Sequence, residues 1–180
     1  MSWKMWRTLK VAMKNLAKKY GCSAIAIQCW NALQGEIGIM PCAANSLLNE
    51  EGIPVVCETD IHGAITAVMA EAAGMDEART FFADWTVRHP DNENGELLQH
   101  CGPWPVSVAK EKPVIGYPLA FEHPGAVEAE AKHGEMTLCR FDGDNGGICS
   151  ASWQRQGCGR ALHEGDLCVG GSGELKTAGK

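Results

Sequence analysis

The chain has 180 residues, of which 45% are hydrophobic and 21% are charged, and its formal net charge at pH 7 is −6. This composition is typical of one globular domain or two small lobes and argues against a disordered chain. The acidic balance argues against nucleic acid as a partner. No apolar run approaches the length of a membrane span, and the N-terminus lacks the apolar stretch of a secretory signal. We therefore expect a cytoplasmic protein that binds neither nucleic acid nor a membrane.

The nine cysteines are spread along the chain without a regular spacing. They lie at positions 22, 29, 42, 57, 101, 139, 149, 158 and 168. A zinc ribbon requires paired ligands at close spacing, and the sequence has no CxxC pair, so a cysteine metal centre or redox centre is not expected. Cys29, Cys57 and Cys139 lie inside apolar runs, where a thiol behaves as a small hydrophobic side chain. Together with the absence of a secretory signal, this predicts a reducing compartment.

The first 75 residues alternate between helical and strand-like patterns. Residues 3–20 carry apolar side chains at helical spacing and are followed by a glycine, which predicts a helix and its end. Residues 22–30 and 53–57 are nearly continuous apolar runs, as in strands covered on both faces. Residues 41–51 and 61–73 predict two further helices, each followed by a glycine. This order predicts a right-handed α/β layer with parallel strands.

After about residue 76, short strand-like segments alternate with turns rich in Gly, Pro, Asn and Asp. These segments are residues 80–87, 96–101, 136–141 and 148–155. Between the last two, residues 142–147 (DGDNGG) predict a hairpin turn. The second part of the chain therefore predicts an antiparallel sheet or a partial barrel.

The predicted fold class is α/β, with a small parallel Rossmann-like layer followed by an antiparallel β-rich lobe. Residues 1–75 form the α/β segment that carries an acidic site, and residues 76–180 form a β-rich C-terminal domain that we expect to be truncated. Residues 170–180 are small and polar, without an apolar pattern, and we expect them to fray.

Polar side chains follow the predicted strands at three places. Glu36 comes after the first buried strand, and Glu58 and Asp60 come directly after the second. His100 ends a later strand, next to a Gly-Pro turn. Each has an ordinary structural alternative: Glu36 as a surface residue, Asp60 as the N-cap of the next helix, and His100 as a satisfied polar residue.

Together these residues make a ligand set for a divalent cation. The carboxyl ends of neighbouring parallel strands meet at one edge of a sheet, which is where ligands bind in such folds. Acidic side chains that leave a buried strand must be capped, paired or bound to a cation. An oxygen-rich set with one nitrogen suits manganese or magnesium better than structural zinc.

Short segments of the chain form a recognisable pattern. They are residues 26–30 (AIQCW), 41–42 (PC), 47–49 (LLN), 52–54 (GIP), 57–60 (CETD), 63–64 (GA), 82–85 (FADW), 100–102 (HCG) and 134–140 (GEMTLCR). This pattern resembles the L-fucose isomerase family and its shorter relatives, and more distantly the arabinose isomerases. The resemblance covers roughly residues 5–165, and the block 41–64 is its most specific part.

The resemblance implies a fold of Rossmann-like α/β domains with a C-terminal β-rich domain, and metal-dependent aldose–ketose isomerisation through an enediol. It implies that Glu36 and Asp60 are the catalytic, metal-binding carboxylates and that His100 is a further ligand, with manganese as the ion. Glu58 is an alternative to Asp60, and Glu58, Trp30 and His100 are the implied substrate contacts. The implied partners are a small sugar substrate and either further copies of this chain, as a homo-oligomer, or a complementary subunit.

Two departures from the family pattern leave a second hypothesis open. The family proteins are considerably longer and have N-terminal domains that help to recognise the sugar. They also carry a histidine ligand near the C-terminus, whereas this sequence ends in GSGELKTAGK. The alternative is therefore a non-catalytic carbohydrate-binding or assembly module, or a fragment of such an enzyme.

Overall fold

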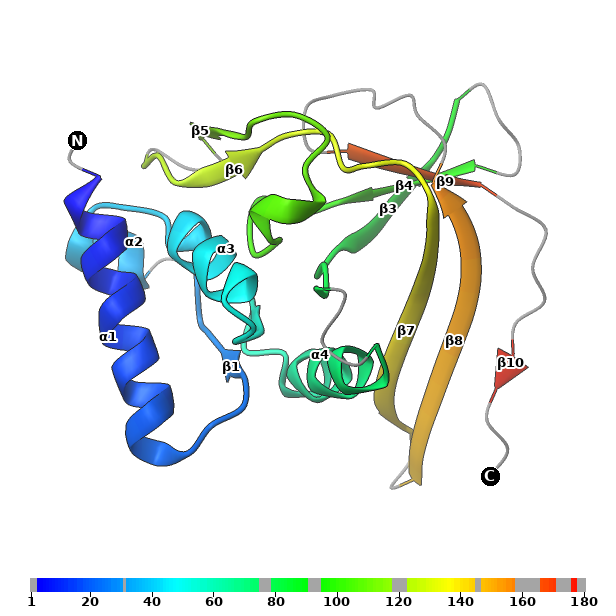
Figure 1. Ribbon diagram of the computed structural model, residues 1–180, viewed down its shortest axis with the longest axis horizontal. Helices are drawn as coiled ribbons and strands as arrows, with labels where there is room; N and C mark the ends of the chain where they lie inside the picture. The colour runs from blue at the N-terminus through cyan, green and yellow to red at the C-terminus, as the bar shows by residue number, and fades with distance from the viewer. Residues whose placement is uncertain are drawn as a thin grey trace.

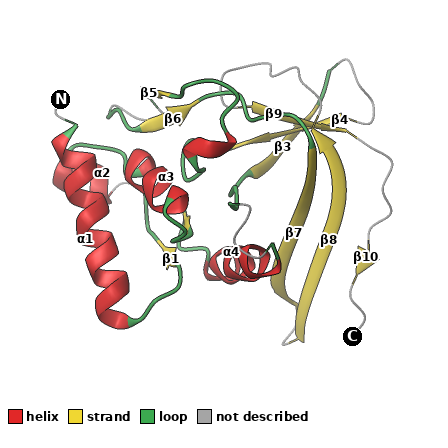
Figure 2. Cartoon of the chain, in the orientation of Figure 1, coloured by secondary structure: helices red, strands yellow, loops and turns green. Residues whose placement is uncertain are grey.

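The chain is a mixed α/β protein whose helices gather on one side and whose long strands lie on the other (Figures 1 and 2). The structure, a computed structural model, describes residues 3–30, 32–74, 79–90, 95–117, 123–144, 147–157, 166–170 and 176–177. Within these ranges the strands form no closed barrel, and no helix is both long and apolar enough to cross a membrane.

The N-terminal helix α1 (Lys4–Tyr20) confirms the helix predicted from apolar spacing. Its buried face consists of Trp6, Met13 and Ala17, which recur at the spacing of one helix face. Gly21 follows with φ of 66° and closes the helix, since its left-handed backbone lets its N–H bond a carbonyl of the last turn.

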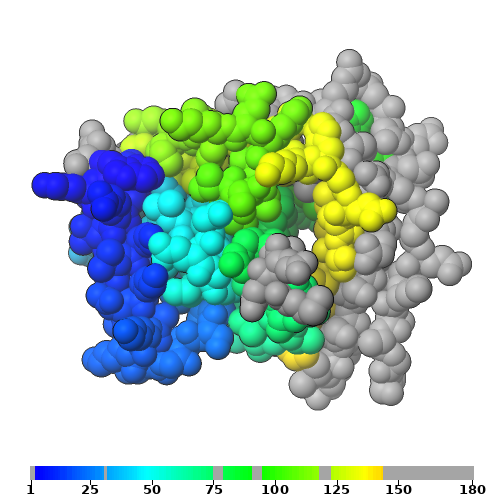
Figure 3. Space-filling model, viewed as in Figure 1, coloured from blue at the N-terminus to red at the C-terminus, as the bar shows by residue number. Residues whose placement is uncertain are grey.

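Two short helices follow α1 before the second strand. α2 spans Ala32–Ile37, and α3 spans Cys42–Glu50. The predicted helix 41–51 is thereby confirmed, whereas α2 was not predicted. α3 packs against α1 and is almost entirely buried, and α1 lies at the left edge of the space-filling view, beside α3 (Figure 3). The Trp6 indole of α1 donates to the Met40 carbonyl just before α3, at 2.9 Å.

The two predicted strands of the first half are short but parallel, as predicted. β1 (Ile25–Ala26) pairs with β2 (Val55–Val56), with Ile25 opposite Val55. The expected strands 22–30 and 53–57 were too long. The strand conformation cannot continue past β2 because the backbone turns left-handed two residues later. The third helix was predicted correctly and is α4 (Ile61–Ala73).

The second half forms an antiparallel sheet in which β10, β8, β9, β4 and β3 lie in that order and β7 adds to β8. The strands are β3 (Asp84–Arg88), β4 (Gly95–Gln99), β7 (Glu135–Asp144), β8 (Gly147–Gly157), β9 (Asp166–Gly170) and β10 (Lys176–Thr177). Each of the four predicted strand segments overlaps a strand, but 80–87 was predicted too long, since residues 80–83 precede β3, and β9 was not predicted. The hairpin is confirmed by the pairing of β7 with β8, although residues 145–146 lie outside the described chain. The expectation that all of 170–180 frays is wrong at β10, which pairs with β8.

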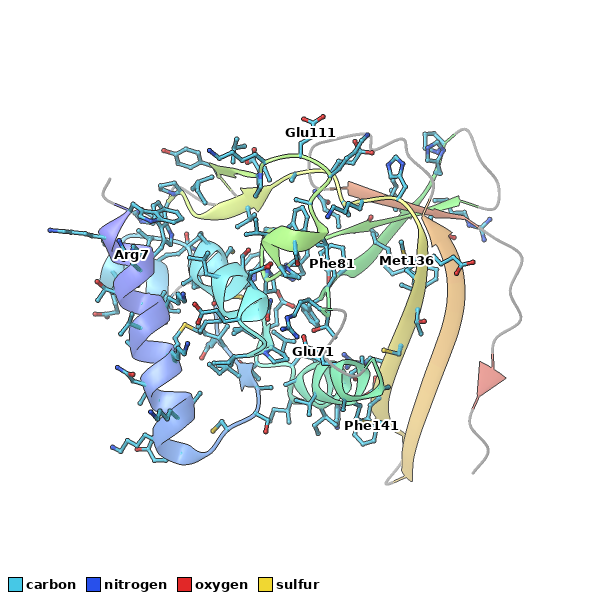
Figure 4. The ribbon with its side chains drawn as sticks, in the orientation of Figure 1. Arg7, Glu71, Phe81, Glu111, Met136 and Phe141 are labelled. Carbon is cyan, nitrogen blue, oxygen red and sulfur yellow. The ribbon has the colours of Figure 1, made fainter. Side chains whose placement is uncertain are left out.

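A small antiparallel pair and a short helix complete the fold: β5 (Val114–Gly116), β6 (Ala126–Glu128) and the 3-10 helix η1 (Val106–Val108). The main apolar cluster draws residues from both halves of the chain, among them Trp6, Ile39, Leu98 and Trp104. Phe81, which lies just before β3, and Met136 of β7 pack against this cluster (both are labelled in Figure 4). The division into domains at residues 75 and 76 stays a prediction.

Candidate metal and substrate site

The acidic turn after β2 has an unusual backbone. Glu58 and Thr59 both have φ of 57°, in the left-handed region that residues with a Cβ seldom adopt. This conformation costs about 1–2 kcal/mol per residue, and such strain is concentrated at functional sites. Asp60 then begins α4 as its N-cap, because its Oδ1 accepts a hydrogen bond from the Gly63 N–H at 2.8 Å. The turn thus places Glu58 at the surface and Asp60 at the start of the helix.

His100 is a buried histidine at the end of β4, with its side chain only 1% exposed. Its Nε2 lies 3.6 Å from Glu58 Oε1, and its Nδ1 accepts the Gly102 N–H at 3.2 Å. Burial lowers the pKa of His100, but contacts with Cys101 and Glu58 and the charge of Asp84 outweigh burial, so the pKa lies above its ordinary value. With Nδ1 as an acceptor, the Nε2 N–H faces the Glu58 carboxylate, and this contact connects the two halves of the chain.

Asp84 completes a group that the sequence did not reveal as a site. Asp84 is the first residue of β3 and pairs with Gln99, the residue before His100. Ligand atoms of Glu58, Asp84 and His100 all lie within 4.8 Å of one another. Burial raises the pKa of Asp84, the charge of Glu58 raises it further, and His100 opposes both. Sequence reasoning missed Asp84, although it stands in the recognisable segment 82–85 beside a strand that leads to His100.

Trp30 lies on the solvent side of this group. Its indole Nε1 donates to Glu58 Oε1 at 3.4 Å, and the residue is 43% exposed. Together with the hydrogen bond from His100, which has the larger effect, this contact lowers the pKa of Glu58. The structure therefore brings together Trp30, Glu58 and His100, the residues for which the resemblance implies substrate contact.

The two carboxylates implied to be catalytic have different surroundings. Glu36 is exposed on α2, a short helix that the sequence did not predict and that is followed by Gly38, whose φ is 65°. Asp60 is bound by the Arg140 guanidinium as well as by the α4 N-terminus. Among the described residues, the groups able to hold a metal ion include neither Glu36 nor Asp60. Their catalytic and metal-binding roles stay predictions.

The group of Glu58, Asp84 and His100 has the chemistry of a divalent cation site. Two carboxylates and one imidazole are hard and borderline donors, which suit manganese, magnesium or zinc. Two carboxylates this close repel each other when both are ionised, and a cation between them would remove that repulsion. Glu58 is 45% exposed at its side chain, so an ion or a small molecule can reach the group from solvent.

Comparison with known proteins finds relatives named sulfoquinovose isomerase, whereas no protein-family model matches the chain. The relative from Alkalicoccus urumqiensis is 32% identical over 139 residues, which is 72% of this chain and 29% of that protein. Those from Priestia aryabhattai and Priestia megaterium are 32% identical over 123 residues, 65% of this chain and 26% of each protein. The chain thus spans less than a third of the length of these curated relatives. These homologues support a sugar isomerase family for the chain.

Proposed function

We propose that this chain carries the metal-binding and catalytic part of an aldose–ketose isomerase. The observation that carries the proposal is that ligand atoms of Glu58, Asp84 and His100 lie within 4.8 Å of one another. The group lies at the turn that follows β2 of the parallel strand pair. The names of the relatives make sulfoquinovose the first substrate to test, and the resemblance to L-fucose isomerases adds L-fucose and D-arabinose. The proposed ion is manganese.

The proposed site combines a buried and an exposed side. His100 is buried beneath Glu58, and its ring centroid lies 5.2 Å from that of Phe82. To bind the ion through Nε2, the ring proton of His100 would move to Nδ1, which now accepts the Gly102 N–H. Asp84 approaches from the first residue of β3. These groups would hold the ion from the protein side and leave the side toward Trp30 for a sugar. An aromatic ring next to a carboxylate is a suitable wall for a sugar, because it contacts C–H groups while the carboxylate accepts from hydroxyls.

The reaction moves a proton between C1 and C2 of the sugar. A bound divalent ion polarises the carbonyl oxygen and acidifies the neighbouring carbon-bound proton. A carboxylate of the chain must then remove that proton, and a carboxyl group must return it to the adjacent carbon of the enediol. Glu58 suits the first task, since it is ionised and reachable from solvent. Asp84, the other carboxyl group within reach of the ion, is the candidate for the second.

Glu36 and Asp60 are the competing pair of carboxylates implied by the resemblance. Asp60 lies two residues from Glu58 and affects its pKa, so it stands beside the same site. For Asp60 to act on substrate, its contact with Arg140 must first open. Glu36 would need the exposed helix α2 to contribute its side chain to the ion or the sugar.

Manganese binding distinguishes these assignments. We expect Glu58→Gln and Asp84→Asn to weaken Mn²⁺ binding, measured by titration calorimetry, by about tenfold or more, because each replaces a charged carboxylate ligand with a neutral amide. The matched variant Glu36→Gln, which also removes one acid, is expected to bind like the wild type. Equal affinity in all variants would overturn the proposed site. If only Glu36→Gln and Asp60→Asn lose Mn²⁺ affinity, Glu36 and Asp60 are the metal ligands instead.

A second candidate function is a non-catalytic carbohydrate-binding or assembly module. The observation that favours it is that the chain spans less than a third of its relatives, so it holds only part of what those proteins contain. Ketose formation from sulfoquinovose, L-fucose and D-arabinose with added Mn²⁺ separates the two functions. The isomerase predicts turnover of at least one aldose, whereas the module predicts sugar binding without ketose.

The parallel strands β1 and β2 support a further proposal about the fold. We propose that β1, β2 and the helices around them are part of a Rossmann-like layer that is larger in the complete assembly. The support is the parallel pairing of β1 with β2 and the position of the acidic turn at its carboxyl end.

A further inference from the structure

Two buried thiols lie directly beneath the acidic turn. Because β1 and β2 are parallel, the chain after β1 runs beside the chain after β2, with the Ile27 N–H bonded to the Val56 carbonyl at 2.9 Å. This places Cys29 and Cys57, which are 1% and 0% exposed, next to each other as free thiols. The Sγ atoms of both cysteines and a carboxylate oxygen of Glu58 all lie within 4.8 Å of one another.

We propose that Cys29, Cys57 and Glu58 form a second metal site, for a thiophilic divalent ion of the zinc and cadmium class. Two thiolates and one carboxylate are a ligand set for zinc, with a fourth position left for water. Ligand atoms on one zinc ion lie about 2.0–2.3 Å from it, so a group no wider than 4.8 Å needs only a small contraction. On binding, each thiol releases its proton to solvent as its sulfur–metal bond forms.

Two further contacts distinguish this pair from cysteines that only fill space. The buried Asn45 amide lies 3.9 Å from Cys57 Sγ through its Nδ2, so a donor already points at the sulfur. Donors of this kind orient metal-bound thiolates and stabilise their charge. Glu58 reaches from the exposed surface to the thiols and thereby brings a negative charge to them.

Glu58 belongs to both ligand groups, so the two ions would compete for it. A zinc ion held by the thiols would draw the Glu58 carboxylate away from His100, whose Nε2 now lies 3.6 Å from it. Zinc should then weaken manganese binding and act as an inhibitor. This competition rests on the proposed isomerase site, whereas the thiolate site itself does not.

Cadmium absorption tests the thiolate site directly. With one equivalent of Cd²⁺ and the purified chain, we expect the ultraviolet charge-transfer band of cadmium bound to thiolate. Cys29→Ala and Cys57→Ala are expected to lower the affinity at least about tenfold, as the loss of a ligand does. Cys22→Ala is the matched control, since Cys22 is an exposed free thiol outside the group and should leave the band unchanged.

Two variants that replace an acidic residue with its amide complete the test. Glu58→Gln retains both thiols and is expected to bind Cd²⁺ more weakly, so it reports on the site even if an alanine variant does not fold. Asp84→Asn is expected to retain the cadmium band while it loses Mn²⁺ affinity. The thiolate site is overturned if folded Cys29→Ala, Cys57→Ala or Glu58→Gln binds Cd²⁺ with the same affinity as the wild type. If the wild-type chain binds Cd²⁺ with the charge-transfer band but does not bind Mn²⁺, the thiolate site is supported and the isomerase site is not. If it binds Mn²⁺ but shows no cadmium band, the thiolate site is overturned and the isomerase proposal is unaffected.

Discussion

Two adjacent residues, Glu58 and Thr59, determine how the chain presents its acidic side chains. Both are in the left-handed region, so the backbone turns sharply after β2 instead of extending. The turn directs Glu58 toward His100 and lets Asp60 cap α4. A backbone that stayed extended would send consecutive side chains to opposite faces, as in any strand. The strain is therefore located where the candidate site needs one acid beside the imidazole.

Thr59 allows this strain to be measured, because it is exposed and its side chain contributes little packing. Glycine adopts a positive φ without steric cost, so Thr59→Gly should be more stable than Thr59→Ala by about 1 kcal/mol. Both variants lose the threonine side chain, so the difference in stability between them reports the backbone strain alone. Urea unfolding at neutral pH gives the difference. An alanine variant as stable as the glycine variant would mean that the turn stores no strain.

Ion pairs attach the helices to their neighbours at several points. Glu51, just after α3, contacts both Lys10 and Lys14 of α1, and the Lys14 Nζ lies 2.8 Å from its Oε2. Asp60 and Arg140 join the start of α4 to β7. The Phe141 N–H also donates to the Thr66 hydroxyl of α4 at 2.9 Å (Figure 4 shows Phe141 at the α4 end of β7). These contacts fix the orientation of the elements that surround the acidic turn.

The Glu51 contacts predict a pH dependence of stability. Hydrogen bonds from Lys10 and then Lys14 lower the pKa of Glu51 below its unfolded value, so the folded state releases this proton more readily than the unfolded chain. The stabilisation is therefore complete above the unfolded pKa of Glu51 and is lost as the pH falls through the lower folded pKa. Because the pair is near the surface, its size at pH 7 should be at most about 1 kcal/mol.

Urea unfolding of the wild type and Glu51→Gln across this acidic range measures the effect. The difference in the free energy of unfolding should be present at pH 7, shrink as the carboxylate is protonated, and fall with added salt. Glu111→Gln, at an exposed acid far along the chain, is the matched control for loss of one negative charge. A difference between wild type and Glu51→Gln that does not change with pH would exclude the ion pairs as its source.

At the scale of the whole molecule, one apolar cluster connects the helical side to the strands. Trp104 is 1% exposed at the centre of this cluster, and its ring centroid lies 5.4 Å from that of Phe81. Its indole N–H donates to the Val127 carbonyl of β6 at 3.2 Å, and its own carbonyl accepts from the Ser46 hydroxyl of α3 at 2.6 Å. The residue thus connects α3, β6 and the segment that leads into β3.

Trp104 should therefore be among the most sensitive positions. Trp104→Ala is expected to cost about 3–5 kcal/mol, a large part of the stability of a domain of this size. Trp104→Phe retains an aromatic ring but leaves the Val127 carbonyl without its donor, so it should cost about 1–3 kcal/mol. Thermal and urea unfolding of both variants check the order. A phenylalanine variant as stable as the wild type would show that the Val127 hydrogen bond contributes little.

The sequence predicted elements whose signal is local. The helices α1, α3 and α4 follow from apolar spacing and terminal glycines, and the hairpin of β7 and β8 follows from its turn-rich segment. Local patterns did not predict α2, β5, β6, β9 or β10. Short elements such as these have too few residues to show a period. Glu58 and His100 were also identified from sequence, since polar residues at the ends of apolar strands stand out.

By itself, the sequence determined the longer helices, the long hairpin and that acidic residues follow a parallel strand pair, because these properties depend on neighbours along the chain. Only the tertiary structure decided which side chains meet. Asp84 reaches His100 because β3 pairs with β4, and Cys29 reaches Cys57 because β1 pairs with β2. Strand pairing joins residues that are far apart in sequence, and no spacing between them encodes the contact. The same reason separates Glu36, which lies on α2, from the described ligand groups.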